Sequence, residues 1–456
     1  MATIQSINPY NEKINWEFEL LSDDQINEKI ETAHNAYLEW KDVSFEEKAK
    51  LFHKFADVVE ANIDEFAKLQ TLEMGMLYTI SKAGMQWTIK LARWFADNAE
   101  SVLKDEEFDY GDVKWKFQYN WLGVIYWVAP WNFPYNQVLR AAIPNILAWN
   151  TQVYKHASNV PMCAAQIEDF FKQAGFPKGI YQNMHISSSK SEMIMEHKHV
   201  RGLNLTGGER AGRVLWALAG KNLKPSVLEL GWNDAFIVAD HDDMNKIVEI
   251  ALAWRMRNGG QTCTGSKRFI VPAKYYDEFC DKFTKAMSSQ KMWDPMDESV
   301  EVQPLCQASA VDEVHRQVQQ SIKDGAKLLT GWNKTSINGK GFFYEPTVLA
   351  DVTSDIYSFH EEVFGPVASV IKAHDIDHSI ELANAIELGL GWVVAWDDQD
   401  QMKYIAERMD TGMVYFNKPA ASLPCIPFGW IKKSGYGQEN GPEGLRSFTS
   451  KKVIVY

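Results

Sequence analysis

One cysteine of this chain, Cys263, stands in a setting suited to nucleophilic chemistry. It lies in the stretch Asn258-Gly-Gly-Gln-Thr-Cys-Thr-Gly-Ser266, between a helical pattern that runs through Trp254 and a β-like run at 268–271. A glycine-hinged loop between two elements is where a reactive thiol is usually presented. A free cysteine is more often an inert, buried residue, so the loop makes Cys263 a candidate nucleophile and no more.

A carboxylate upstream of this loop, Glu229, belongs to the apolar run 226–231. A carboxylate in such a run needs a polar partner or a reason to be buried. Burial would raise its pKa toward the range in which a general base works at neutral pH. Glu229 is therefore the candidate base.

These two stretches resemble the general-base and nucleophile motifs of the aldehyde dehydrogenase superfamily. Three further motifs follow the family's order and spacing: Pro130-Trp-Asn-Phe-Pro134, Glu361-Glu-Val-Phe-Gly-Pro366 and Ser434-Gly-Tyr-Gly-Gln-Glu439. The resemblance covers nearly the whole chain, and in detail it is similar to the shorter bacterial succinate-semialdehyde dehydrogenases. It implies NAD(P)-dependent oxidation of an aldehyde to a carboxylic acid through a cysteine thiohemiacetal and a thioester, with succinic semialdehyde and succinate as the expected pair.

The apolar run at 123–128 predicts a buried parallel strand that leads into Pro130-Trp-Asn-Phe-Pro134. Ligands of open α/β sheets bind at this end of the strands. By resemblance, Asn132 is the side-chain donor of an oxyanion hole, beside the backbone N–H of Cys263, and Trp131 belongs to the cofactor site. Without the other motifs, Asn132 would simply close a turn between two prolines.

The strand expected at 151–155 ends at Lys155, which the resemblance assigns to the adenosine ribose of the cofactor. Relatives restricted to NAD commonly have Glu at the position of Ser158. Because a neutral hydroxyl does not repel a 2′-phosphate and can donate to it, we expect NADP to be accepted as well as NAD.

The sequence has no G-x-G-x-x-G motif. The stretch 202–212 instead predicts a strand, a glycine turn and a helix whose first N–H groups could face a pyrophosphate, with Gly207, Gly208 and Gly212 as cofactor residues. The family usually has Ser at position 208, so Gly208 is expected to lose a hydroxyl contact with phosphate.

In the motif 361–366, the resemblance assigns Glu362 to the nicotinamide ribose and Phe364 to packing at the nicotinamide end. The alternative is a pair of solvated acids before a turn. Glu439 is expected to have only a structural role. For the substrate carboxylate, Arg140 is the candidate partner, although an arginine on a helix is more often part of a surface ion pair.

The length of 456 residues exceeds the roughly 250 to 300 residues at which one core stops growing. We expect an α/β protein with a Rossmann-type dinucleotide-binding domain (1–105 and 122–228) and an α/β catalytic domain (229–415). Alternating apolar residues at 106–120 suggest a hairpin, which by resemblance is part of a β oligomerisation arm (106–121 and 440–456). A homodimer or homotetramer is therefore expected; an ordinary surface hairpin is the alternative.

A net charge of −13 argues against partners that need a basic surface, namely nucleic acids and anionic membranes. No run approaches the roughly 20 apolar residues of a membrane span, and the first residues do not resemble a signal peptide. We therefore expect a cytoplasmic enzyme that acts on a small aldehyde.

Five scattered cysteines form neither a disulfide pattern nor a metal-ligand pattern, so no metal site is predicted.

Tryptophan stands at four positions where the family pattern has glycine: Trp149, Trp232, Trp392 and Trp430. An indole supplies neither the positive φ nor the close backbone approach that glycine permits. This leaves open an alternative of a different class, an aldehyde dehydrogenase-like oligomer with impaired catalysis and a binding or structural role. An enzyme based on a Cys-His pair is a third possibility, but no His stands in a supporting motif.

Overall fold

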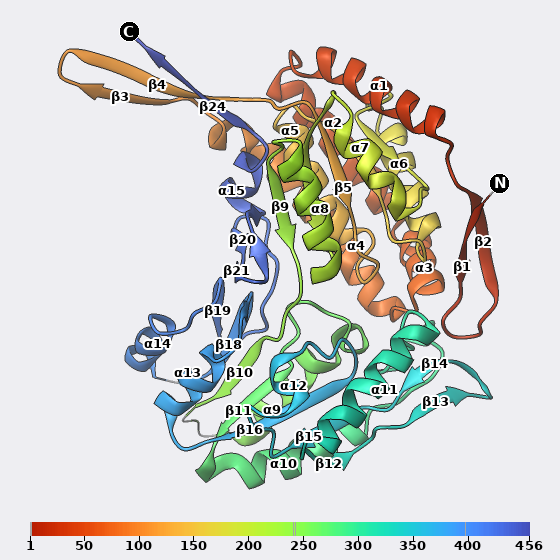
Figure 1. Cartoon of the computed structure of the whole chain (residues 1–456), viewed down its shortest axis with the longest axis vertical. Helices are drawn as coiled ribbons and strands as arrows, with labels where there is room; N and C mark the ends of the chain where they lie inside the picture. The colour runs from red at the N-terminus through yellow and green to blue at the C-terminus, as the bar shows by residue number, and fades with distance from the viewer. Residues whose placement is uncertain (1, 240, 242, 397) are drawn as a thin grey trace.

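The computed structural model describes residues 2–239, 241, 243–396 and 398–456. Two sheets, each covered by helices, form the upper and lower halves of the molecule in Figure 1, and a thin three-stranded arm projects from the upper half. The mixed α/β architecture agrees with the predicted fold class.

The upper sheet has six strands in the order β22-β9-β8-β5-β6-β7, all parallel except β22. Its strands are β5 (Val124–Val128), β6 (Thr151–Lys155), β7 (Tyr181–Asn183), β8 (Val200–Thr206), β9 (Ser226–Glu229) and β22 (Gly435–Tyr436). The helices of this half are α1 (Asp23–Trp40), α2 (Phe45–Ala61), α3 (Ile63–Met74), α4 (Tyr78–Val102), α5 (Asn136–Leu147), α6 (Pro161–Gln173), α7 (Ser191–Glu196) and α8 (Glu209–Lys221), with a 3-10 turn at Ser188–Lys190.

Successive residues of β5 point to opposite faces of this sheet. Val124 and Tyr126 pack in a core shared with α1 and α8, whereas Ile125 and Trp127 pack in the core beneath α2, α4 and α5. The continuous apolar run predicted a strand buried on both faces, and the structure confirms it.

The first two helices, α1 and α2, each begin with a capping box. Ser22 accepts a hydrogen bond from the N–H of Gln25 while the Gln25 side chain accepts from the N–H of Ser22, and Ser44 and Glu47 repeat this capping box. Each box satisfies N–H groups that have no partner within the helix.

The lower sheet has seven strands in the order β12-β15-β16-β11-β10-β18-β19. Only β12 runs antiparallel to its neighbour. The strands are β10 (Ala235–Val238), β11 (Arg268–Pro272), β12 (Lys327–Thr330), β15 (Thr347–Ala350), β16 (Val367–Ala373), β18 (Gly391–Ala395) and β19 (Met413–Phe416). The helices of this half are α9 (Met244–Met256), α10 (Ala273–Ser288), α11 (Ala308–Lys323), α12 (Tyr357–His360), α13 (Ile376–Asn384) and α14 (Gln399–Ala406).

The chain crosses from the upper to the lower sheet between Glu229 and Ala235, and returns after Phe416. The predicted boundaries at 228/229 and 415 lie near these crossings, and the division into domains stays a prediction. Short pairs lie at the edges: β1 (Thr3–Ile7) with β2 (Ile14–Glu19), β13 (Lys334–Ile337) with β14 (Lys340–Tyr344), β17 (Leu388–Gly389) with β21 (Ile431–Lys432), and β20 (Phe428–Gly429) with β23 (Gln438–Glu439).

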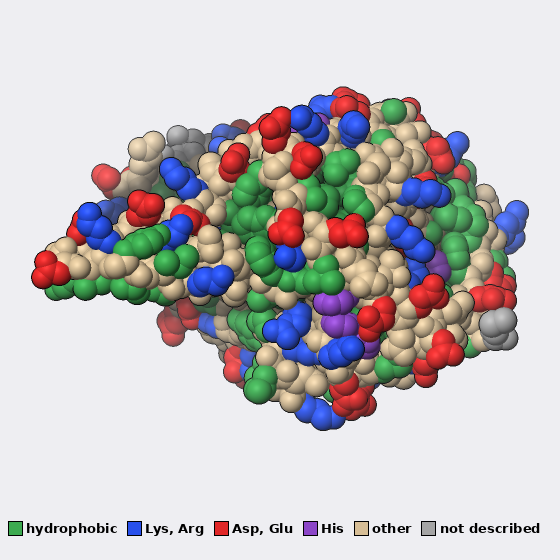
Figure 2. Space-filling model, turned by 90° about the horizontal axis from the view of Figure 1, so that it is seen from above, with side chains coloured by type: hydrophobic (Ala, Val, Ile, Leu, Met, Phe, Trp, Pro, Cys, Tyr) green, Lys and Arg blue, Asp and Glu red, His purple; other side chains and the backbone are tan. Residues whose placement is uncertain are grey.

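The arm consists of β3 (Glu106–Tyr110), β4 (Val113–Asn120) and β24 (Ser450–Val455) in the antiparallel order β24-β4-β3. The segment before β24 forms the short helix α15 (Gly441–Arg446), and the bounds given to the arm stay a prediction. Figure 2 shows hydrophobic side chains along the projecting arm; the exposed ones include Phe108, Tyr110, Val453 and Val455.

No helix in the described part of the chain is both long enough and apolar enough to cross a membrane.

Candidate active site

Cys263 lies on a loop whose preceding turn has a left-handed backbone and needs glycine at one position. The 3-10 turn Arg257–Gly260 precedes it, and Asn258, Gly259 and Gly260 all have positive φ, from 54° to 75°. A Cβ added to Gly260 would lie 2.0 Å from the carbonyl oxygen of Gly365, so this position has no room for a side chain. The loop also contacts the motif at 130–134, since Asn258 Nδ2 donates to the carbonyl of Asn132 at 2.9 Å.

Cys263 lines two cavities. The glycine-side cavity, about 240 Å³, is lined by Trp131, Asn132, Gly207, Gly208, Gly231, Trp232, Cys263, Glu362 and Phe364, among others. The arginine-side cavity, about 300 Å³, is lined by Trp87, Phe133, Asn136, Arg140, Arg257, Cys263, Leu423 and Phe428, among others. A thiol between two cavities can react with a molecule from one side while a second molecule occupies the other.

Cys263 is 8% exposed and belongs to the hydrophobic core of the upper half, with several polar groups near its thiol. Burial raises the pKa of Cys263 and the Glu229 carboxylate raises it further, while Arg140 and Lys267 act in the opposite direction. Gln137 Nε2 lies 3.9 Å from Sγ, and Asn132 Nδ2 donates to the carbonyl of Gln261 at 3.0 Å. Deprotonation of the thiol therefore requires a base or a nearby cation to compensate for burial.

Glu229, at the end of β9, is fully buried and is held by Arg140 of helix α5. Burial raises the pKa of the Glu229 carboxyl; Arg140 opposes this shift and Glu439 adds to it. One of its oxygens, Oε1, has no hydrogen-bond partner among the described residues. A carboxyl with a raised pKa and a free oxygen next to a thiol has the properties of a general base.

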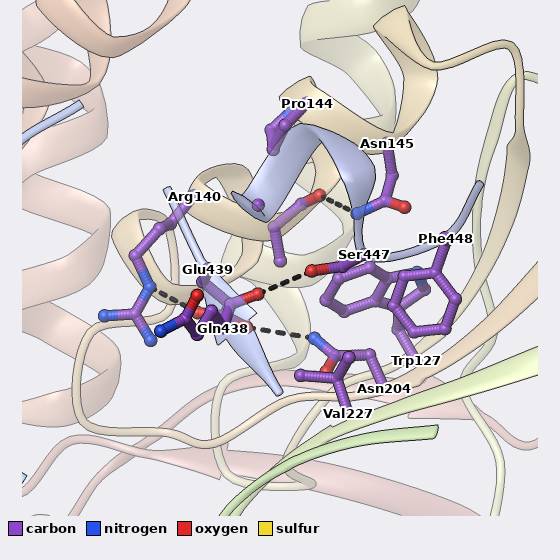
Figure 3. Close-up of a pocket in the computed structure, with 12 residues that line it drawn as sticks. Trp127, Arg140, Pro144, Asn145, Asn204, Val227, Gln438, Glu439, Ser447 and Phe448 are labelled. Atoms are coloured by element: carbon purple, nitrogen blue, oxygen red, sulfur yellow. Dashed lines mark hydrogen bonds and ion pairs between the residues drawn. The ribbon is translucent and has the colours of Figure 1, made fainter. Parts of the chain in front are cut away.

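Arg140 joins two carboxylates. Its Nη2 donates to Glu229, and its Nε donates to Glu439 Oε2 at 2.5 Å, while Asn204 Nδ2 donates to the other oxygen of Glu439 at 3.0 Å. Figure 3 shows Arg140 and Asn204 both directed at Glu439, beside a small cavity with room for about one water molecule. The guanidinium also lies over the ring of Phe428 at 4.3 Å.

This arrangement bears on the prediction that Arg140 binds the substrate. Arg140 does border the arginine-side cavity, but its charge is already balanced by two buried carboxylates. Arg257 lines the same cavity with an exposed side chain that forms no ion pair with any residue in the described part of the chain. Its guanidinium lies near the rings of Trp254 and Phe133, 5.2 and 5.7 Å from their centres.

The glycine-side cavity collects most of the predicted cofactor residues. Trp131 and Phe364 meet edge to face at 5.6 Å, and Glu362 reaches the same space. Gly208 is the N-cap of α8, and a Cβ there would contact nothing within 4 Å. At Gly212 a Cβ would lie 2.4 Å from the Leu230 side chain, so this glycine lets α8 pack closely on the chain after β9; its assignment to the cofactor stays a prediction.

Lys155 and Ser158 lie at the carboxyl end of β6, on the edge of the sheet that also presents the ends of β8 and β9. Lys155 Nζ donates to the carbonyl of His156 at 3.2 Å, and Ser158 is exposed. These two residues are outside the lining of the glycine-side cavity, as expected for groups that would contact the far end of a long ligand.

The comparisons with known proteins agree with this geometry. The sequence pattern of the aldehyde dehydrogenase family matches residues 1–454. The chain belongs to the aldehyde dehydrogenase family. It is 39% identical to succinate-semialdehyde dehydrogenase (NADP+) 1 of Mycobacterium tuberculosis over 456 residues, which cover 99% of both chains.

Two solved structures illustrate the likeness of fold. Succinic semialdehyde dehydrogenase from Streptococcus pyogenes in complex with NADP+ superposes with a TM-score of 0.96 at 35% identity, covering 99% of each chain. PnpE in complex with nicotinamide adenine dinucleotide superposes with a TM-score of 0.96 at 27% identity, covering 100% of this chain and 94% of the other. The family and the fold inferred from the five motifs are therefore confirmed.

Tryptophan is accommodated differently at the four positions where the family pattern has glycine. Trp149 keeps a left-handed backbone, with φ of 65°, and its ring packs against Phe45. Trp232 and Trp430 pack together with ring centres 5.9 Å apart, and Trp392 is buried in the core of the lower sheet. Trp232 borders the glycine-side cavity without filling it.

Three residues beside the thiol of this aldehyde dehydrogenase were missed by the sequence analysis: Gln137, Arg257 and Lys267. Arg257 immediately precedes the nucleophile loop and Lys267 immediately follows it. For Lys267 the sequence did contain a signal, because this cation directly precedes a strand that is buried on both faces. A cation in that place must find hydrogen-bond acceptors. No group of three or more His, Cys, Asp or Glu within the described ranges is arranged to hold a metal ion.

Proposed function

We propose that this aldehyde dehydrogenase oxidises succinic semialdehyde to succinate, with NADP as the preferred oxidant. The observation that carries the proposal is the position of Cys263 between a cavity with an accessible arginine and a cavity with the expected cofactor residues. The relatives named for this reaction with NADP support the choice of substrate and cofactor.

The arginine-side cavity suits an aldehyde that carries a carboxylate. Arg257 would bind the carboxylate through charge-assisted hydrogen bonds, and Phe133 and Phe428 provide apolar walls for a short carbon chain. The aldehyde carbon would then approach Sγ of Cys263, which borders the same space. In this proposal Arg140 does not bind the substrate; it holds Glu229.

In the first half of the reaction, the Cys263 thiolate adds to the aldehyde carbon, forming the C–S bond and an oxyanion. Asn132 Nδ2 and the backbone N–H of Cys263 would donate to this oxygen, each contributing about 3 to 4 kcal/mol to transition-state stabilisation. When the oxyanion collapses, the C=O bond re-forms, the hydride leaves the former aldehyde carbon and a thioester to Cys263 remains; a bound oxidised nicotinamide would supply the hydride acceptor.

In the second half, Glu229 accepts a proton from a water molecule, which attacks the thioester carbon. The C–S bond then breaks, succinate is formed, and Sγ leaves as the thiolate. A base at this position favours hydrolysis over transfer of the acyl group to another thiol, because it makes water the better nucleophile.

Two features of the glycine-side cavity and one residue beyond it, at the carboxyl end of β6, suit a dinucleotide. The open N-terminus of α8 at Gly208 leaves backbone N–H groups free for phosphate oxygens. Glu362 Oε1 is paired with Lys267 Nζ at 3.1 Å, and its remaining lone pair could accept from a ribose hydroxyl. Ser158, exposed and neutral, places no negative charge where a 2′-phosphate would lie, which supports NADP over strict dependence on NAD.

We further propose that the chain acts as a homodimer or homotetramer that buries the hydrophobic side chains of the arm. Exposed apolar side chains on a projecting three-stranded sheet have no core of their own to enter, and a second copy could cover them. A cytoplasmic location stays a prediction.

The first experiment measures reduced-cofactor formation with succinic semialdehyde, using NAD and NADP separately, for the wild type and Cys263→Ala. We expect turnover that is faster with NADP and that is lost in the alanine variant. If the wild type forms no reduced cofactor with this substrate or with a panel of aliphatic and aromatic aldehydes, the result would instead favour the alternative, an oligomer with impaired catalysis. The Trp232 and Trp430 pair would then be the first place to look for the cause.

A further inference from the structure

Lys267 is a buried cation whose contacts all belong to the catalytic site. Its side chain is 2% exposed. Nζ donates to the carbonyl of Cys263 at 2.6 Å and to the carbonyl of Thr262 at 3.1 Å, and it lies 3.1 Å from Glu362 Oε1. Two of its three N–H donors therefore go to peptide carbonyls, and its charge is paired with Glu362.

The contact with Thr262 is the informative one. The carbonyl of Thr262 and the N–H of Cys263 belong to the same peptide group, which is planar and conjugated. A hydrogen bond from a cation to the oxygen of a peptide group polarises the group and makes its N–H a stronger donor. The N–H of Cys263 is one of the two donors proposed for the oxyanion, and it forms no hydrogen bond with any residue that the structure describes.

The position of Lys267 is fixed independently of the thiol. Its own N–H donates to the carbonyl of Asp234 at 2.9 Å, and its carbonyl accepts from the N–H of Ser369 at 2.9 Å. Glu362 holds the ammonium from the other side. The cation is therefore preorganised and need not move when charge develops on the substrate oxygen.

We propose that Lys267 is a positioning residue that strengthens the oxyanion hole by polarising the Thr262–Cys263 peptide group. This inference rests on the proposed function, because it assumes that the Cys263 N–H binds an oxyanion. The role proposed for Lys267 is the same whichever aldehyde and whichever cofactor the protein uses.

Two reactions of Cys263 separate this role from a general effect on the thiol. Acylation by p-nitrophenyl acetate forms a tetrahedral oxyanion, releases p-nitrophenolate and leaves an acetyl thioester. Alkylation by iodoacetamide displaces iodide and forms no oxyanion. Both need the thiolate, but only acylation needs the oxyanion hole, so the ratio of the two rate constants measures the hole.

The experiment measures both rate constants without cofactor, with the modified residue located by peptide mass spectrometry. In Lys267→Met we expect the ratio of acylation to alkylation to fall about 10-fold or more, since removing a whole oxyanion donor costs about 100- to 1000-fold. Lys267→Arg keeps a cation and should retain a ratio within about 3-fold of wild type. If Lys267→Met does not fold, Lys267→Gln is compared with Lys267→Arg in the same way.

Lys48→Met is the matched control. Lys48 is also fully buried, but its ammonium lies over the rings of Trp40 and Trp149 and has no hydrogen-bond partner among the described residues. Lys48 lines neither cavity at Cys263, so removing this buried lysine should leave both rate constants unchanged.

The inference is overturned if Lys267→Met lowers acylation and alkylation equally, because Lys267 would then act only on the thiol. It is also overturned if wild-type Cys263 is alkylated but never acylated. If succinic semialdehyde or NADP turns out not to be used, acylation and alkylation of Cys263 can still be measured. A wrong proposed function can therefore be distinguished from a wrong inference about Lys267.

Discussion

The arginine-side cavity has two arginines whose environments are opposite. Arg140 is buried and forms ion pairs with Glu229 and Glu439, whereas Arg257 is exposed to the cavity and forms no ion pair with a described residue. A guanidinium whose charge is matched by two protein carboxylates fixes the protein's own geometry. A guanidinium without a protein partner is available to a ligand. The two residues have the same chemistry, and only their neighbours assign one to the catalytic base and the other to the substrate.

The largest effect is expected from Arg140→Gln. Removing one partner of a buried ion-paired cluster costs about 3 to 5 kcal/mol, because Glu229 and Glu439 remain as buried carboxylates without a cation. Turnover should fall about 100-fold or more, to the same extent for succinic semialdehyde and for uncharged butanal. Thermal unfolding and steady-state kinetics measure the two effects. A loss confined to succinic semialdehyde would mean that Arg140 is a substrate residue after all.

Arg257→Gln should act on the substrate alone. A hydrogen bond to a charged group is worth about 1.5 to 3 kcal/mol, so the KM for succinic semialdehyde should rise about 10- to 100-fold while kcat/KM for butanal changes little. Because the side chain is exposed, the melting temperature should be nearly unchanged. If butanal is affected equally, the contrast between the two arginines fails.

In the wild type, the pH dependence of kcat should report the base that Arg140 holds, and the pH dependence of KM should report Arg257. Burial raises the pKa of Glu229 above the ordinary 4.5, and a base acts only when deprotonated, so kcat should increase with pH through a limb well above pH 4.5. The charge of Arg257 does not change between about pH 6 and 9, so the KM for succinic semialdehyde should stay constant there. Pre-steady-state bursts of reduced cofactor identify the range in which hydrolysis limits turnover.

Glu439→Gln should have the smallest effect and a definite sign. Glu439 raises the pKa of Glu229 by its negative charge, so removing that charge should shift the acid limb of kcat to lower pH. Arg140→Gln removes the cation that lowers the same pKa and should shift the limb to higher pH. Activity of Glu439→Gln near pH 8 should stay within about 3-fold of wild type. Limbs that move in the same direction in both variants would contradict the assignment of Arg140 to Glu229.

Much of this protein could be predicted from local sequence because the relevant physics is local. The capping boxes at Ser22 and Ser44, the buried strand at 123–128 and the glycine turn before Cys263 each depend on residues close together in the chain. The five motifs also identified the family from the sequence, because each motif is a short run of neighbouring residues. Helix α15 (Gly441–Arg446) shows no comparable local pattern: it buries Leu445 in the core of the upper half, and that contact comes from distant parts of the chain.

What each charged residue does was decided only by the tertiary structure. The sequence marks Cys263, Glu229 and Asn132 as candidates, and it marks Arg140 as a cation near them. It does not reveal that Arg140 meets Glu439, almost 300 positions further along the chain, or that Lys267 donates to the peptide of the nucleophile. The physical reason is that the free energy of a buried charge depends on the acceptors around it, and folding brings those acceptors from distant parts of the chain.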